Sequence, residues 1–249
     1  EFLALPRNTT RMKAQGPSAR NRTLIHRALI QPLLIMVAAC ILLCVSLPLA
    51  AGPGSTAGPS SETALSGSVL FTFLDVGQGD AILVSTSDGH HMLVDGGPRS
   101  AGLGLAARLR ELGIKHLDVL VSTHPHEDHI GGLADVLNAV TVGRVIDSGK
   151  VHTSATYERY LSIIDEKNIP FALGRANDRF RLGDAGVQII WPTGALAEDM
   201  NDVSVVLRVD YGESSALLTG DIGPGVEQYL AEHKALSRVV LLKVAHHGS

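Results

Sequence analysis

The stretch Ser122–Gly132 (S-T-H-P-H-E-D-H-I-G-G) decides the fold of this chain, because it places four metal-binding side chains within six residues. These side chains are His124, His126, Asp128 and His129. The mainly apolar run Leu117–Val121 precedes the stretch and predicts a buried strand, and Ile130–Leu133 opens a predicted helix. The cluster is therefore expected at the junction between a strand and a helix, where side chains can converge on one point.

Imidazole and carboxylate groups are ligands that suit zinc, manganese or iron. In an extended segment, alternate residues point the same way, so His124 and His126 are expected to bind one ion, with Asp128 and His129 serving a second. The alternative is a histidine-rich surface loop. The H-x-H-x-D-H spacing at a strand end favours a metal site.

Composition limits the other possibilities. Hydrophobic residues make up 45% of the 249 residues, which is enough for a core, and charged residues make up only 18%. The two cysteines, Cys40 and Cys44, both lie in one apolar segment. Disulfide scaffolding and cysteine-ligated zinc are thus excluded for the remainder of the chain.

The N-terminal part predicts export of the body. Residues 1–28 carry six basic residues and one acidic residue, and are expected to form a cytoplasmic tail or loop. Residues 29–51 are uncharged and long enough for a transmembrane or signal-anchor helix, with everything that follows outside the cytoplasm. The alternatives are a cleaved signal peptide ending near Ala50 and Ala51, a lipoprotein signal ending at Cys40, and a buried core helix.

Residues 52–68 are rich in Gly, Pro and Ser and predict a flexible linker, so the compact domain is expected over residues 69–249. Beyond residue 28 there are 15 basic and 24 acidic residues, a formal charge of −9. Such an acidic body does not favour broad electrostatic binding of nucleic acid. Because the chain starts at Glu1 and stops within a motif-like H-H-G-S, it is expected to be a fragment at both ends.

Strand and helix patterns alternate through the domain and predict an α/β layered architecture. Strands are expected at 69–74, 81–86, 91–94, 117–121, 142–146, 187–191, 203–209, 215–218 and 239–244, and helices at 104–112, 133–140, 153–167 and 223–233. The polar candidates follow the ends of strands: Asp95, the 124–129 cluster, Asp221, and the pair His246 and His247. Side chains that share this position meet at one edge of the sheets.

Five motifs in this order resemble the metallo-β-lactamase superfamily. They are L-D-V-G-Q-G-D-A (74–81), L-V-D-G-G (93–97), the opening stretch, L-L-T-G-D (217–221) and V-A-H-H-G-S (244–249). Within the superfamily the chain is similar to the C-terminal extracytoplasmic domain of ComEC-type DNA-internalisation competence proteins. Some phosphorylcholine esterases share the same opening and H-P-H-x-D-H strings.

The resemblance implies a four-layer αβ/βα sandwich, truncated at its C-terminus and preceded by one transmembrane helix. It also implies two divalent ions, zinc or manganese. His124 and His126 would bind the first ion, Asp128 and His129 the second, and Asp221 would bridge them; His246 or His247 would complete the second. Asp128 and Asp95 are the candidate catalytic carboxylates, with Asp95 orienting a ligand or the attacking water.

One departure from the family concerns a third ligand for the first ion. Many members supply a histidine between residues 146 and 205, where this chain has only His152 in a dissimilar context. The tract N-D-V-S-V-V (201–206) instead resembles one in ComEC-type domains, and Asn201 is a candidate weak ligand. D-V-G-Q-G-D (75–80) is either a phosphate cradle or a sharp bend, in which Asp80 braces the metal loop from behind.

The implied function is metal-dependent phosphodiester hydrolysis outside the cytoplasm, with no Ser or Cys nucleophile. The expected partners are single-stranded DNA at the metal site, the membrane through residues 29–51, and other DNA-uptake components. Arg99, Lys150 and Lys243 are the local basic residues expected to contact DNA. The alternatives are a phosphorylcholine-esterase-like metallohydrolase, secreted or anchored, and a metal-free structural module of a DNA-transport complex.

Overall fold

The computed structural model describes residues 67–194, 197–233, 236 and 238–248. The predicted tail (1–28), the apolar segment (29–51) and nearly all of the linker lie outside the described residues. None of the helices in the described part of the chain has both the length and the apolar character needed to cross a bilayer.

The first sheet has six strands in the order β1–β2–β3–β5–β7–β8. They are β1 (Val69–Phe73), β2 (Ile82–Thr86), β3 (His91–Val94), β5 (Val119–Ser122), β7 (Val145–Asp147) and β8 (Phe171–Leu173). β1, β2 and β3 form an antiparallel meander, whereas β3, β5, β7 and β8 are parallel. The C-terminal ends of β3, β5 and β7 therefore lie at one edge of this sheet.

The second sheet has five strands in the order β13–β12–β11–β10–β9. They are β9 (Arg179–Leu182), β10 (Ala185–Trp191), β11 (Val206–Tyr211), β12 (Ser214–Leu218) and β13 (Leu241–Lys243). Only the β12–β13 pair is parallel, so both of these strands end at the same edge. A third, two-stranded sheet consists of the parallel pair β4 (His116–Leu117) and β6 (Thr141–Val142).

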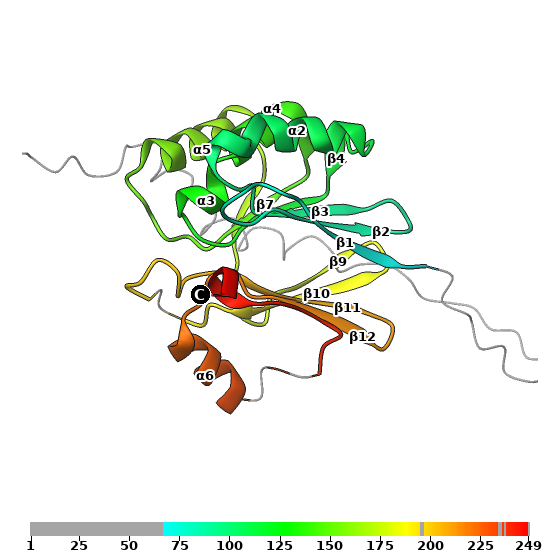
Figure 1. Cartoon of the computed structure of the whole chain (residues 1–249), viewed down its shortest axis with the longest axis vertical. Coiled ribbons are helices and arrows are strands. Elements are labelled where there is room, and N and C mark those ends of the chain that lie inside the picture. The colour runs from blue at the N-terminus through cyan, green and yellow to red at the C-terminus, as the bar shows by residue number, and fades with distance from the viewer. Residues whose placement is uncertain (1–66, 195–196, 234–235, 237, 249) are drawn as a thin grey trace, which may run out of the picture.

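Helices cover the outer faces of the two sheets, as Figure 1 shows. The helices are α2 (Gly102–Glu111), α3 (Glu127–Ile130), α4 (Leu133–Ala139), α5 (Ala155–Glu166) and α6 (Pro224–Glu232), with 3-10 turns at Arg99–Ala101 and Ala245–Gly248. α2, α4 and α5 lie on the first sheet and α6 on the second. The predicted α/β layering is confirmed, in the order helix, sheet, sheet, helix.

Alternation along each strand divides the apolar residues between two layers of core. Leu83, Leu93 and Leu120 pack against the helices of the first sheet. Their neighbours, such as Val94 and Val121, point the other way and meet residues of the second sheet. Because side chains alternate across a strand, buried strands supply both layers at once.

The sequence missed β8 and β9 and extended β11 too far. β8 has three residues, and β9 (R-F-R-L) carries two charges, so neither gives a clear apolar run. Residues 203–205, predicted as strand, precede β11 in a turn and an irregular segment. The helix predicted to open at Ile130–Leu133 begins earlier, because α3 already includes both Asp128 and His129.

Candidate metal centre

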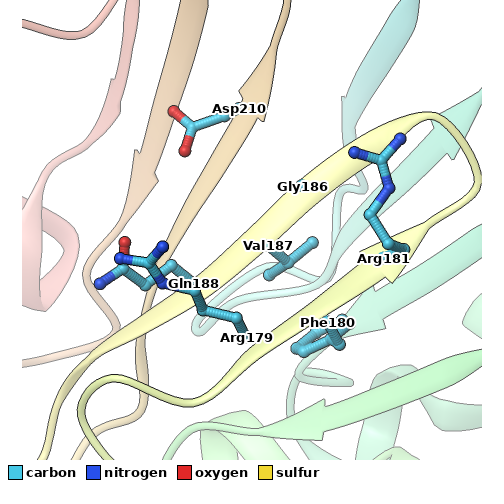
Figure 2. A pocket seen from close by; sticks show the side chains of 7 residues that line it. All are labelled: Arg179, Phe180, Arg181, Gly186, Val187, Gln188 and Asp210. Atoms are coloured by element: carbon cyan, nitrogen blue, oxygen red, sulfur yellow. The ribbon is translucent and has the colours of Figure 1, made fainter.

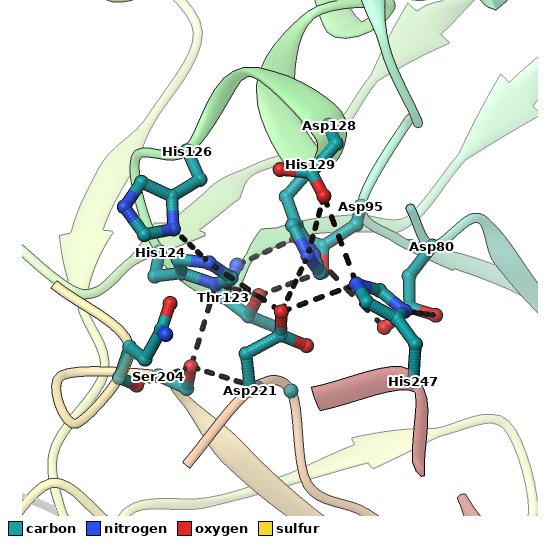
Figure 3. Close-up of polar contacts among 12 residues, drawn as sticks. Asp80, Asp95, Thr123, His124, His126, Asp128, His129, Ser204, Asp221 and His247 are labelled. Atoms are coloured by element: carbon teal, nitrogen blue, oxygen red, sulfur yellow. Dashed lines mark hydrogen bonds and ion pairs between the residues drawn. The ribbon is translucent and has the colours of Figure 1, made fainter. Parts of the chain in front are cut away.

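The polar side chains at the ends of the strands form a cluster, and the fully buried Asp95 holds one of its histidines, His129. Asp95 follows β3 with a φ of 58°, in the left-handed region that Asp tolerates better than most residues. One oxygen accepts from the backbone N–H of Thr123 (2.8 Å), and the other accepts from the Thr123 hydroxyl (2.6 Å) and from Nδ1 of His129 (2.8 Å). This fixes the His129 ring with Nε2 directed away from Asp95 (Figure 3).

Nε2 of His129 faces two carboxylates from separate parts of the chain. It lies 3.1 Å from Oδ2 of Asp221 and 4.0 Å from Oδ2 of Asp128. Asp221 follows β12 in the second sheet, whereas His129 belongs to α3 beside the first sheet. The cluster therefore spans the edge where the two sheets meet.

His124 forms the other half of the cluster and is also fully buried. Its Nε2 lies 3.1 Å from Nδ1 of His126 and 4.0 Å from Oδ2 of Asp221. Ser204, which the sequence interpretation did not single out, joins these groups. Its Oγ lies 3.3 Å from Nδ1 of His124 and accepts from the backbone N–H of Asp221 at 3.1 Å.

The structure distinguishes the two terminal histidines. Nε2 of His247 lies 3.2 Å from Oδ2 of Asp221 and 3.7 Å from Oδ2 of Asp128. Its neighbour His246 is exposed and belongs to none of the potential ligand groups in the described part of the chain. Both residues have positive φ, 48° and 55°, so the backbone turns sharply here and directs only His247 into the cluster.

Lys243 and Asp80 also belong to the cluster. Lys243 was expected to contact DNA; the residue is only 7% exposed, and its ammonium group lies inside the cluster. Its Nζ lies 2.6 Å from Oδ2 of Asp80 and 3.3 Å from Oδ1 of Asp221. Arg99 and Lys150 were also expected to contact DNA. Arg99 is exposed, and Lys150 donates through Nζ to the backbone carbonyls of Ala197 and Glu198.

The pKa values of the two buried histidines are shifted in opposite directions. Burial alone would lower the pKa of His129, but the charges of Asp95 and Asp221 and their hydrogen bonds outweigh it and raise this pKa to about 10. Burial lowers the pKa of His124 to about 2, helped by the charge of His129. The pKa of Asp221 is lowered, since the hydrogen bond from His129 and the charges of His129 and Lys243 outweigh its burial. A proton is thus favoured on His129, whereas His124 stays neutral.

The donor set fits a pair of divalent cations. Asp95 and Asp221 are buried and Asp80 and Asp128 are half-buried, and Lys243 and a protonated His129 offset only part of their negative charge, so cations would balance the remainder. The facing donor atoms lie 3.1–4.0 Å apart. Ligands about 2.0–2.2 Å from a tetrahedral zinc would lie roughly 3.3–3.6 Å from one another. The donors are nitrogen and oxygen only, which suits zinc or manganese.

The structure gives no clear third ligand for the first ion. His152 accepts through Nδ1 from the backbone N–H of Ser154 and is in none of the ligand groups among the described residues. The backbone carbonyl of Asn201 accepts from the N–H and the hydroxyl of Ser204. Oδ1 of Asn201 is buried and has no hydrogen-bond partner in the described part of the chain, so Asn201 stays a candidate ligand.

A groove on the second sheet is separate from this cluster. It lies over β9, β10 and β11, and Figure 2 shows the side chains that line it. The lining residues are Arg179, Phe180, Arg181, Gly186, Val187, Gln188 and Asp210. With one carboxylate and no histidine, the groove lacks the donors of a metal site.

Comparison with known proteins identifies the class. The family model described as "Metallo-beta-lactamase superfamily" matches residues 74–249, so the chain belongs to this superfamily. A metallo-beta-lactamase from Cronobacter sakazakii is similar in structure, with a TM-score of 0.48 and 15% identity over 72% of this chain and 77% of that one.

Within the superfamily, several curated relatives are of ComEC type. ComE operon protein 3 from Bacillus subtilis (strain 168) is 28% identical, covering 71% of this chain and 25% of its own length. Competence protein ComA from Neisseria gonorrhoeae is also 28% identical, covering 77% of this chain and 24% of its own length. The chain therefore spans about a quarter of each of these relatives.

Proposed function

We propose that this chain is a metal-dependent phosphodiesterase that cleaves DNA as part of a ComEC-like uptake protein. The observation that carries the proposal is the convergence of His124, His129, Asp221 and His247 at the edge where the two sheets meet. Membership of the metallo-β-lactamase superfamily and the ComEC-type relatives support it. The membrane anchor at residues 29–51, the extracytoplasmic location and association with other uptake components are parts of the same proposal.

We assign the ligands from the geometry. His124 and His126 would hold one cation and Asp128, His129 and His247 the other, with Asp221 between them. Two such cations would supply positive charge to the phosphodiester oxygens and lower the pKa of a water molecule. The protein residues provide orientation. Asp95 fixes His129 through Nδ1, and Ser204 contacts both Nδ1 of His124 and the backbone N–H of Asp221.

His126→Ala tests this assignment because His126 is half-buried and contacts the cluster through His124. We expect the variant to lose manganese- or zinc-dependent cleavage of single-stranded DNA by at least about 100-fold. His116→Ala is the matched control, since His116 is exposed and its Nδ1 lies 2.9 Å from the Thr141 hydroxyl, outside the cluster. Unchanged activity in His126→Ala would refute the nuclease proposal.

The formal charge of −9 beyond residue 28 favours a second candidate, an esterase for a small phosphodiester such as phosphorylcholine on a polymer. Parallel assays on single-stranded DNA and on bis(p-nitrophenyl) phosphate distinguish the two. A DNA-cleaving enzyme should show a much higher kcat/KM on DNA, and cleavage that falls with added salt. A protein that binds no metal and cleaves neither substrate would instead be a structural module.

A further inference from the structure

Lys243 is a lysine whose ammonium group lies inside the cluster. Burying an ammonium group costs several kcal/mol unless it is paired and hydrogen-bonded. Nζ of Lys243 meets three oxygens, from Asp80 (2.6 Å), the carbonyl of Gly220 (2.8 Å) and Asp221 (3.3 Å). Because an ammonium group has three N–H donors, these contacts can satisfy all of them and fix both carboxylates in place.

Asp80 occupies a position toward His247 that resembles the position of Asp95 toward His129. Oδ1 of Asp80 lies 3.5 Å from Nδ1 of His247, on the ring nitrogen opposite the one that faces Asp221. The backbone holds Asp80 as well, because its carbonyl accepts from the N–H of Gly97 at 2.8 Å. Asp80 is thus attached to both Lys243 and the segment that follows β3.

We propose that Asp80, held by Lys243, is the positioning carboxylate of His247. A proton on Nδ1 facing Asp80 leaves the lone pair of Nε2 directed at Asp221 and Asp128. Lys243 also engages Oδ1 of Asp221, which leaves Oδ2 facing the histidines. This inference deepens the proposed function and rests on its two-cation centre, in which Asp80 and Lys243 would govern the ion that His247 helps to bind.

The change in cation affinity when Lys243 is removed shows whether this residue positions the carboxylates or acts only as a nearby positive charge. If Lys243 acted only as a nearby positive charge, its removal would relieve repulsion and tighten cation binding. If it positions Asp80 and Asp221, its removal should weaken binding, because both carboxylates lose the group that holds them. Positioning groups of this kind typically change metal affinity by 10- to 100-fold.

The experiment titrates the full, metal-free chain with Mn²⁺ by calorimetry and follows the paired manganese signal by electron paramagnetic resonance. The variants are Asp80→Asn and Lys243→Met. The control is Asp75→Asn, an exposed carboxylate in the same loop whose Oδ1 accepts from the N–H of Gly77 at 3.1 Å. We expect about 10- to 100-fold weaker binding of one ion in Asp80→Asn and of at least that ion in Lys243→Met, loss of the paired signal in both, and no change in the control.

Three results would overturn the inference: Asp80→Asn binding both ions normally, Asp80→Asn losing both ions equally, or Lys243→Met binding them more tightly. If Asp80→Asn does not fold because Lys243 is left poorly paired, the double variant Asp80→Asn/Lys243→Met removes that buried charge and gives the same comparison. A wild-type chain that binds fewer than two ions would refute the proposed centre itself, which is a distinguishable outcome.

Discussion

Asp95 shows how a single residue can orient a histidine of the proposed metal site from behind the ring. It is fully buried, and its oxygens are used by Thr123 and His129. Its predicted catalytic role is therefore better described as positioning, because a substrate cannot reach a carboxylate behind the histidine. The cost of its left-handed φ of 58° is offset by these three hydrogen bonds.

Asp95→Asn should weaken the binding of one divalent ion by about 10- to 100-fold, because the amide holds Nδ1 of His129 less strongly than a carboxylate does. Calorimetric titration with Mn²⁺ measures the change. Asp118→Asn is the control, since Asp118 makes the same 2.8 Å contact to Nδ1 of His90 outside the cluster. Equal affinities in wild type and Asp95→Asn would show that Asp95 does not orient a ligand.

A second buried carboxyl, Asp147 at the end of β7, should make stability depend on pH. Burial raises the pKa of Asp147 to about 6, although hydrogen bonds from the Gly149 N–H and the Tyr160 hydroxyl lower it in part. Between pH 4 and 6 the folded carboxyl keeps a proton that the unfolded one has lost, so stability falls as pH rises. The loss should approach about 3 kcal/mol by pH 7.

Urea unfolding from pH 4 to pH 7 measures this effect against Asp147→Asn, which carries no titrating group at this position. The stability of wild type relative to the variant should decrease as pH rises through this range. A difference that stays constant with pH would show that the Asp147 carboxyl is already ionised at pH 4.

The residues that could be predicted from sequence were those whose type and spacing carry chemistry. His124, His126, Asp128, His129 and Asp221 converge as their motifs implied. Lys243 could not be recognised as a member of the cluster from sequence. A lysine in a strand is usually exposed, and Asp80, which stabilises it, lies far away in the chain. Which of His246 and His247 faces the cluster also depended on the backbone angles, which the sequence does not give.

At the scale of the element, the loop 75–80 packs closely against the metal-ligand motif at Asp128. Gly79 has a φ of 100°, and a Cβ at this position would overlap the backbone carbonyl of Asp128. Of the two alternatives for D-V-G-Q-G-D, the structure supports the sharp bend in which Asp80 braces the centre. Gly77, with a φ of 78°, has open space around it.

Replacing Gly79 with Ala should therefore destabilise the protein by about 2 kcal/mol or more beyond the same change at Gly77. Both substitutions pay for positive φ, but only the first forces the loop away from Asp128. The free energy of unfolding and the affinity for Mn²⁺ should both fall in Gly79→Ala. Equal losses of unfolding free energy in Gly79→Ala and Gly77→Ala would show that close packing of the loop against Asp128 does not contribute to stability.

Secondary-structure elements could be predicted where a hydrophobic periodicity extended over many residues or where capping and turn residues marked the ends. The α5 helix has five buried residues and an N-terminal cap in which Ser154 Oγ accepts from the N–H of Tyr157. β8 and β9 were missed because their residues gain a strand conformation from the neighbours β7 and β10 rather than from their own pattern. Their stability is tertiary in origin.

At the scale of the whole molecule, the centre joins two layers that otherwise meet through apolar packing. His129 comes from the side of the first sheet and Asp221 from the second. Ions that bind only the folded protein add stability, about 2.7 kcal/mol at one hundred times the dissociation constant. For a domain of this size, saturation with Mn²⁺ should raise Tm by roughly 5–10 °C.

Differential scanning calorimetry with Mn²⁺ and with excess EDTA measures this shift. His126→Ala should show a smaller shift, and His116→Ala should match wild type. A Tm that does not respond to Mn²⁺ at concentrations well above the measured dissociation constant would mean that the cations do not bridge the two layers.

The order of these groups along the chain has a consequence for biosynthesis. Asp80 precedes β2, whereas Lys243 lies in β13 and His247 follows it, so the ribosome synthesises Asp80 long before both of these partners. A nascent polypeptide that has not yet reached β13 would leave Asp80 and Asp221 without Lys243, and the proposed second cation without His247. The proposed two-cation centre can therefore be completed only after residues 243–247 have been made.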